Sequence, residues 1–499
     1  MSEQKSLQEW RSLADSLTIR GQAFIDGRYV DAASGATFDS VNPANGHTLA
    51  AIASTDSEDV DRAVAAARRV FERGHWSRMA PRDRKAVMLR FAELVARHAD
   101  ELALLETMDM GKPIADSTAI DIPGTAHCLA WYGEAIDKIY DEVAPTGPDE
   151  LGMITREPVG VVACVVPWNF PLLMAAWKLG PALAAGNSVI LKPSEKSPLT
   201  AVRIAELAAE AGLPDGVLNV LPGLGTTAGK ALALHMDVDC LAFTGSTAVG
   251  KLILQYSGQS NMKRVWLECG GKSPNIVLAD CQDLDKAAAA AASGIFFNQG
   301  EVCSAASRLL IEASIKEPFL EKLMAAGERM QPGDPMDPAS PMGAIVDGIQ
   351  FDTVMGFIEK GQNEGATIRM GGKQLLKETG GWFVAPTVFD DVRHDMSIAQ
   401  QEIFGPVLST ISFTDPDEAM RMANDIPYGL AAAVWTRDLR KAHRIARALR
   451  AGTVWVNCYD VGDLSVPFGG FKESGNGRDK SLHALDKYVE LKTTWIDLS

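Results

Sequence analysis

Two series of short apolar runs, separated by amphipathic stretches, organise the chain. The first begins near residue 160 and contains GVVACVV, NSVILK, GVLNVL, DCLAF and RVWLE. The second begins at Pro274 and contains PNIVLA, SRLLIE, GATIRM, FGPVLSTISF, AAAVWT and GTVWVN. Buried strands that alternate with helices are typical of doubly wound parallel sheets. The pattern therefore predicts an α/β protein with two such domains.

Helical spacing of apolar residues fills the intervening segments. Val60, Ala63 and Ala67 recur at this spacing, and Thr55 and Glu58 ahead of them have the separation of a capping box. Further helices are predicted over residues 201–211, 228–235, 283–297 and 416–424. Two alternating segments, 141–157 and 487–498, lie outside both series, and each is expected to form an extended arm that offers an edge strand.

Composition narrows the functional classes. The 499 residues are 46% hydrophobic and carry a formal net charge of −16, which disfavours binding to nucleic acids and anionic membranes. Seven cysteines without a C-x-x-C pair or neighbouring histidines disfavour a metal site. The polar first residues lack a secretory signal, so a cytoplasmic location is expected. Residues 159–177 are uncharged, but Pro167 and Pro171 split them into a strand and a helix, which argues against a membrane span.

Two glycine-rich turns are candidate phosphate sites. Gly223, Gly225 and Gly229 follow one predicted strand but have G-x-G-x-x-x-G spacing rather than the usual dinucleotide fingerprint. Gly245 and Ser246 follow another strand where a helix begins, so that backbone amides can hold a pyrophosphate. Each turn is also compatible with a purely structural role.

A third candidate follows the strand NSVILK. Lys192 and Glu195 stand at its carboxyl end, where ligands of open α/β sheets bind. The carboxylate of Glu195 suits ribose hydroxyls and would repel a 2′-phosphate, which favours NAD, while Lys192 keeps NADP open. A solvated charged turn is the structural alternative.

Cys303 and Glu268 are the candidate catalytic pair. Cys303 lies in a small polar loop after Gly300, unlike the cysteines in apolar runs, although a lone loop cysteine is compatible with a structural role. Glu268 ends the strand RVWLE just before two glycines, where burial can tune the pKa of a general base.

Seven motifs in order along nearly the whole chain resemble the NAD(P)-dependent aldehyde dehydrogenase superfamily. They are PWNFP at 167–171, KPSE at 192–195, FTGS at 243–246, LECGGK at 267–272, GEVC at 300–303, EIFGP at 402–406 and PFGG at 467–470. The tail GNGRDKSLHAL and the ending ELKTTWI resemble the enzymes of polyamine catabolism that oxidise γ-glutamyl-γ-aminobutyraldehyde or 4-guanidinobutyraldehyde.

The resemblance implies a fold of two Rossmann-like doubly wound domains and a small β oligomerisation arm. Residues 1–140 and 160–272 would form the NAD(P)-binding domain, 273–472 the catalytic domain, and 141–159 and 486–499 the arm of a homodimer or homotetramer.

By the same resemblance, Cys303 attacks the aldehyde, Asn169 and the Cys303 N–H hold the oxyanion, Glu268 activates water, and Lys178 lies near a proton path to Glu268. The cofactor would contact Trp168, Lys192, Glu195, Gly225, Gly229, Gly245, Ser246, Val249, Gly270, Glu402 and Phe404. Asp479 stands where many relatives have glutamate, which leaves a relay role for that position open.

The expected substrate is a small ω-amino, ω-guanidino or γ-glutamylamino butyraldehyde from putrescine or agmatine. Asp121, Asp460 and Asp463 are the candidate carboxylates for its cationic end, with solvated or capping acids as the alternative. Other functions considered are a broad aliphatic or betaine-type aldehyde dehydrogenase, a coenzyme A-acylating enzyme, a cofactor-independent thiol hydrolase, and a binding protein on a dehydrogenase scaffold. The presence of Glu268 favours the hydrolytic branch.

Overall fold

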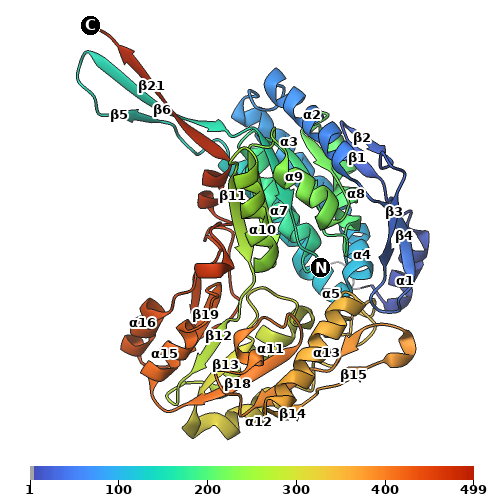
Figure 1. Cartoon of the computed structure of the whole chain (residues 1–499), viewed down its shortest axis with the longest axis vertical. Coiled ribbons are helices and arrows are strands. Elements are labelled where there is room, and N and C mark those ends of the chain that lie inside the picture. The colour runs from blue at the N-terminus through green and yellow to red at the C-terminus, as the bar shows by residue number, and fades with distance from the viewer. Residues whose placement is uncertain (1–4) are drawn as a thin grey trace.

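The computed structural model describes residues 5–499 and contains two large sheets and a projecting arm (Figure 1). The first sheet has seven strands in the order β11-β10-β7-β8-β9-β1-β2, of which β7 to β11 are parallel and β1 and β2 are antiparallel additions at one edge. Its strands are β1 (Ala23–Ile25), β2 (Arg28–Val30), β7 (Val161–Val165), β8 (Ser188–Lys192), β9 (Leu218–Val220), β10 (Cys240–Gly245) and β11 (Arg264–Cys269).

Helices cover both faces of this sheet. They are α2 (Ser57–Arg73), α3 (Pro81–Arg97), α4 (Ala99–Met110), α6 (Ile122–Ala135), α7 (Pro171–Ala184), α8 (Leu199–Glu210), α9 (Lys230–Leu234) and α10 (Thr247–Gln259). Val162 and Cys164 of β7 pack in the core with α3, α4, α7 and α8, whereas Val161 and Ala163 pack in the core with α2, α9 and α10. Burial on both faces explains why the strands read as continuous apolar runs.

The second sheet is also doubly wound, with the order β14-β17-β18-β13-β12-β19-β20, and only β14 runs antiparallel to its neighbour. Its strands are β12 (Pro274–Val277), β13 (Arg308–Glu312), β14 (Thr367–Met370), β17 (Thr387–Asp390), β18 (Val407–Phe413), β19 (Ala431–Trp435) and β20 (Thr453–Val456). Its helices are α11 (Leu284–Phe296), α12 (Lys316–Gly327), α13 (Gly348–Asn363), α14 (Ser397–Gln400), α15 (Pro416–Asn424) and α16 (Leu439–Ala448).

Three antiparallel strands, β21 (Val489–Asp497), β6 (Glu150–Pro158) and β5 (Glu142–Ala144), form the arm that extends away from both sheets (Figure 1). The prediction that its last strand begins at residue 487 is wrong. Lys487 and Tyr488 are buried in the body of the molecule, and pairing with β6 starts at Val489.

The remaining elements are short. They are α1 (Leu7–Ser16), α5 (Ile114–Asp116), β3 (Thr37–Val41), β4 (Thr48–Ala53), β15 (Gln374–Leu375), β16 (Phe383–Val384), the π-helical turns η1 (Ser117–Asp121) and η2 (Gly225–Gly229), and the 3₁₀ turns η3 (Phe297–Gly300), η4 (Ala313–Ile315), η5 (Lys377–Thr379), η6 (Lys472–Ser474) and η7 (Leu482–Lys487). Of the helices in the described part of the chain, none has the length and apolar character needed to cross a bilayer.

All eleven strands predicted from apolar runs are confirmed, but the edge pair β1–β2 and strand β17 were not predicted. The predicted capping box at α2 is wrong by one position: Asp56 caps the helix together with Asp59. The hydroxyl of Thr55 instead donates a hydrogen bond to the Pro222 carbonyl at 2.6 Å. The predicted helix over 228–235 is shorter, because the π-helical turn η2 takes the residues before Lys230.

Candidate active site

Cys303 lies in a loop that leaves α11 through a tight backbone reversal. Asn298, Gln299 and Gly300 all have positive φ, at 48°, 57° and 72°. A β-carbon at Gly300 would come within 2.2 Å of the Gly405 carbonyl oxygen, so this position requires glycine. The reversal places the half-buried Cys303 at the wall of a cavity of about 550 Å³, a volume suited to a small organic ligand.

The cavity beside Cys303 is mainly apolar. Its aromatic lining comes from both sheet regions and consists of Phe170, Trp177, Phe297, Trp455 and Phe468. Burial raises the pKa of the Cys303 thiol, and the carboxylate of Glu402 raises it further. This environment therefore favours the neutral thiol of Cys303 over its thiolate.

Asn169 is held against the Cys303 loop. Its side-chain amide donates a hydrogen bond to the Glu301 carbonyl at 2.9 Å, and the Asn298 amide donates one to the Asn169 carbonyl at 3.0 Å. The strand β7 and the start of α7 at Pro171 fix the segment that carries Asn169. These bonds bring the predicted oxyanion donor and the predicted nucleophile into one loop cluster.

Glu268 occupies a closed glycine-walled site at the end of β11. Neither of its carboxylate oxygens has a hydrogen-bond partner within residues 5–499. A β-carbon at Gly469 or Gly477 would approach Glu268 Oε1 to 2.7 and 2.9 Å, and one at Gly469 would also come within 2.4 Å of the Gly477 carbonyl oxygen. Burial raises the pKa of Glu268 well above its usual range. The raised pKa makes the ionised form of Glu268 a stronger base, which suits it to take a proton from water.

A buried three-residue ion network adjoins this base. Lys178 and Lys487 each donate a hydrogen bond to one oxygen of Asp479. Burial acts to raise the pKa of Asp479, but the two ammonium groups outweigh it and hold that pKa below its usual value. The structure thus brings Lys178 next to Asp479, and it adds Lys487, which sequence reasoning did not select.

Glu402 lies over the first glycines after Glu268. Its Oε1 accepts a hydrogen bond from the Gly271 N–H at 3.0 Å, and a β-carbon at Gly270 would come within 1.9 Å of Oε2. Burial raises the pKa of Glu402 to about 7. The absence of a side chain at Gly270 is therefore what allows this carboxylate to approach the backbone.

Four more of the predicted cofactor residues form two pairs, one aromatic and one charged. Trp168 and Phe404 meet edge-on with ring centroids 5.1 Å apart. Lys192 at the end of β8 donates a hydrogen bond to Glu195 at 3.0 Å. Burial acts to raise the pKa of Glu195, but Lys192 lowers it overall, so Glu195 is a carboxylate at neutral pH.

The predicted glycine turns border open space at the end of the first sheet. Added β-carbons at Gly225 and Gly229 would meet no atom within 4 Å. Gly245 ends β10, and Ser246 caps α10 by accepting a hydrogen bond from the Val249 N–H at 3.3 Å. This arrangement leaves room for a ligand beside the start of a helix.

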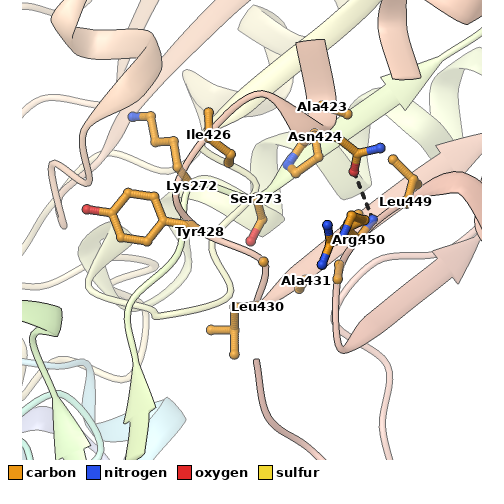
Figure 2. Close-up of a pocket in the computed structure, with 14 residues that line it drawn as sticks. Lys272, Ser273, Ala423, Asn424, Ile426, Tyr428, Leu430, Ala431, Leu449 and Arg450 are labelled. Atoms are coloured by element: carbon orange, nitrogen blue, oxygen red, sulfur yellow. Dashed lines mark hydrogen bonds between the residues drawn. The ribbon is translucent and has the colours of Figure 1, made fainter. Parts of the chain in front are cut away.

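A second, smaller pocket lies beside β12 and β19 of the second sheet (Figure 2). Lys272 and Ser273 line it, and the side-chain oxygen of Asn424 accepts a hydrogen bond from the Arg450 N–H at 2.8 Å. Burial lowers the pKa of Lys272 to about 7. The cavity of about 10 Å³ has room for no more than about one water molecule, so it is too small for an aldehyde.

The three candidate substrate carboxylates have different environments. Asp460 lines the cavity with Cys303 and accepts a hydrogen bond from the Ser304 hydroxyl at 3.3 Å. Asp121 is a wrong prediction: it is fully buried and accepts a hydrogen bond from Lys112 at 2.8 Å. Asp463 is exposed, lies outside the cavity lining and accepts the Ser465 N–H at 2.8 Å, as a capping acid does.

The model of the aldehyde dehydrogenase family matches residues 29–494, so the chain belongs to that family. It is 57% identical over 489 residues to the NADP/NAD-dependent aldehyde dehydrogenase PuuC of Escherichia coli K12, and the match covers 98% of each chain. A solved indole-3-acetaldehyde dehydrogenase in complex with NAD⁺ superposes with a TM-score of 0.99, with 63% identity over 99% of this chain and 100% of that one. The γ-glutamyl-γ-aminobutyraldehyde dehydrogenase of Burkholderia cenocepacia J2315 superposes with a TM-score of 0.98, 62% identity and the same coverage.

Sequence reasoning missed several buried polar residues around Cys303 and Glu268. Lys487 contacts Asp479, Lys480 lines the cavity, and the fully buried carboxylate of Glu301 accepts the Val346 N–H at 3.1 Å. Lys480 is the last residue of the GRDK stretch and Lys487 follows seven residues later, so the charges of that stretch were the only available signal.

Proposed function

We propose that this member of the aldehyde dehydrogenase family oxidises an aldehyde to a carboxylic acid through a covalent intermediate on Cys303, with NAD or NADP as the hydride acceptor. The observation that carries the proposal is the combination of Cys303 at a mainly apolar cavity with the carboxyl group of Glu268, which has no hydrogen-bond partner within residues 5–499. Asn169, on the loop cluster beside Cys303, supplies the third group.

The residues divide the reaction into two halves. Cys303 Sγ bonds to the aldehyde carbon, and the Asn169 amide and the Cys303 N–H stabilise the oxyanion. When bound, NAD or NADP would supply the acceptor for the hydride on this carbon, and loss of that hydride would leave the carbon joined to Sγ as a thioester. Glu268 then takes a proton from water, whose oxygen attacks the thioester carbon and releases the acid and the Cys303 thiol.

The residues at the end of the first sheet fit a dinucleotide. Open space beside Gly225 and Gly229 and the capped start of α10 at Ser246 suit a pyrophosphate. Glu195 and Glu402 are carboxylates at positions suited to two ribose groups. The solved relative in complex with NAD⁺ supports this assignment.

We further propose an ω-amino, ω-guanidino or γ-glutamylamino butyraldehyde from putrescine or agmatine breakdown as the substrate. Asp460 in the cavity lining supports a cationic group distant from the carbonyl. The Burkholderia relative named for γ-glutamyl-γ-aminobutyraldehyde supports the same class. The relative named for indole-3-acetaldehyde keeps a neutral aldehyde as the second candidate.

The assembly is also a proposal. The first sheet would bind the cofactor, the second would carry Cys303, and the arm would pair subunits as a homodimer or homotetramer. Exposed Leu491 and Trp495 on β21 support this role of the arm. All seven cysteines are free, which supports a reducing, cytoplasmic location.

Two variants test the covalent route. Cys303→Ala should abolish NADH formation from any aldehyde, whereas Glu268→Gln should retain a single burst of NADH and lose acid release. Retained turnover in Cys303→Ala would contradict the mechanism. Acyl release without any nicotinamide cofactor would instead identify a thiol hydrolase.

A further inference from the structure

Two opposite charges line the same cavity without pairing. Lys480 and Asp460 are both in the lining, yet Lys480 forms no ion pair within 4.0 Å in the described chain. Within residues 5–499, Asp460 accepts a hydrogen bond only from the Ser304 hydroxyl. The cavity therefore presents an ammonium group and a carboxylate that are both available to a ligand.

The backbone around Lys480 is strained in a way that places this side chain. Lys480 and Ser481 have φ values of 62° and 52°, a backbone conformation that is unfavourable for residues other than glycine. Paired N–H···O bonds of 2.7 Å between Phe468 and Asp479, and one of 2.6 Å from Ser481 N–H to the Leu464 carbonyl, hold it. Consecutive side chains thus diverge: Asp479 enters the buried ion network and Lys480 enters the cavity.

Aromatic rings contact the Lys480 ammonium, and the carboxylates of Asp463 and Asp460 are near enough to raise its pKa, although neither forms an ion pair with it in the described chain. Its Nζ lies 5.5 Å from the Trp177 ring centroid and 5.9 Å from that of Phe468. The residue is only 9% exposed, and burial lowers its pKa. Such contacts orient a lysine over apolar surface, and a carboxylate from a ligand would supply the direct ion-pair partner that Lys480 lacks in the described chain.

We propose that Lys480 binds the carboxylate of a substrate whose end distant from the aldehyde is zwitterionic, while Asp460 binds its ammonium group. This inference rests on the proposed function and selects within it. An ω-amino or ω-guanidino aldehyde brings only a cation, which Lys480 repels. A γ-glutamylamino aldehyde brings both charges and matches both side chains.

The test compares four aldehydes with the full-length enzyme and NAD. They are γ-glutamyl-γ-aminobutyraldehyde (zwitterionic), 4-guanidinobutyraldehyde (cationic), 5-oxopentanoate (anionic) and hexanal (neutral). In Lys480→Gln, kcat/KM relative to hexanal should fall about tenfold or more for the zwitterion and the anion, since hydrogen bonds to charged groups are strong, and should rise for the cation. Asp460→Asn should lower the relative value for the zwitterion and the cation.

Matched variants separate recognition from folding. Lys480→Arg should restore selectivity, and Lys480→Met should reproduce the Lys480→Gln pattern. Lys322→Gln is the control, because it removes a lysine on α12 that pairs with Asp285 outside the cavity. Equal losses for all four aldehydes in Lys480→Gln would overturn the inference and assign Lys480 a structural role.

The proposed substrate class can fail separately. If the wild-type enzyme prefers hexanal to every charged aldehyde, that class is wrong. In that case, a selective loss of 5-oxopentanoate turnover in Lys480→Gln still supports carboxylate binding by Lys480. The absence of such a loss overturns it.

Discussion

Lys178 donates a hydrogen bond to Asp479 in the interior, where each side chain is only 1% exposed. Lys487 donates to the other carboxylate oxygen, so two ammonium groups face one carboxylate. Together the three groups carry a charge of about +1 beside Glu268. Burial and the charge of Asp479 raise the pKa of Glu268, whereas the two lysines lower it. The network therefore compensates for part of the cost of ionising the catalytic base.

This arrangement predicts opposite shifts in the pH profile of acid release. Asp479→Asn removes a negative charge, which lowers the pKa of Glu268 and moves the acidic limb to lower pH. Lys487→Met removes a positive charge, which raises that pKa and moves the limb to higher pH. Stopped-flow measurement of thioester hydrolysis from pH 5 to 9 checks both shifts.

Conservative variants control for misfolding in this network. Lys487→Arg keeps the charge and should keep the limb near its wild-type position. Shifts of Asp479→Asn and Lys487→Met in the same direction would show that the network does not act on Glu268 through its charge.

Asp121 should contribute to stability rather than to substrate choice. It shares Lys112 with Glu106, and all three side chains are fully buried. Asp121→Asn should lower the free energy of unfolding by about 3 kcal/mol, because a buried pair is broken, and should leave the ratio of kcat/KM for charged and neutral aldehydes unchanged. Denaturant titration measures the first effect.

The exposed Asp463 provides the control for Asp121. Asp463→Asn should change stability by less than about 0.5 kcal/mol. A selective rise in KM for cationic aldehydes in Asp121→Asn would return Asp121 to the substrate site.

The apolar runs predicted the strands well because burial on both faces leaves a local signature that tertiary contacts do not alter. Strand β1 was missed because it has only three residues and gains its place by pairing with β9, almost 200 positions later. Contacts across such distances have no local pattern.

The candidate site likewise contains residues that the local sequence marks and residues whose place depends on distant contacts. Cys303 and Glu268 stood out because strand ends and glycines mark them. Asp121 was misassigned because sequence gives no sign that Lys112, nine residues earlier, faces it in the interior. Lys487 was counted as part of the arm, since its burial depends on contact with Asp479 rather than on the alternation around it.

Glu195 should set the preference between the two nicotinamide cofactors. Its carboxylate is partly exposed and would repel a 2′-phosphate, whereas Lys192, 3.0 Å away, reduces the repulsion. Glu195→Gln should raise the ratio of kcat/KM for NADP over NAD about two- to fivefold, in line with the roughly 0.2–1 kcal/mol of a partly exposed charge pair. Initial-rate assays with both cofactors measure it, and an unchanged ratio would remove Glu195 from the ribose site.

Deleting residues 489–499 should dissociate the assembly while leaving each subunit folded. Strand β21 pairs along its length with β6, yet Leu491, Trp495 and Leu498 are 65%, 57% and 59% exposed. Exposed apolar residues on a projecting strand are a surface that a second subunit would cover.

The cut must fall after Tyr488, because removing Lys487 would also leave Asp479 in the interior without one of its two lysine partners. Light scattering should show a smaller species with an unchanged far-ultraviolet circular dichroism spectrum per residue. Trp495→Lys, which keeps the strand but charges this surface, should weaken assembly in the same direction, whereas an unaltered mass for both variants would place the subunit contact elsewhere.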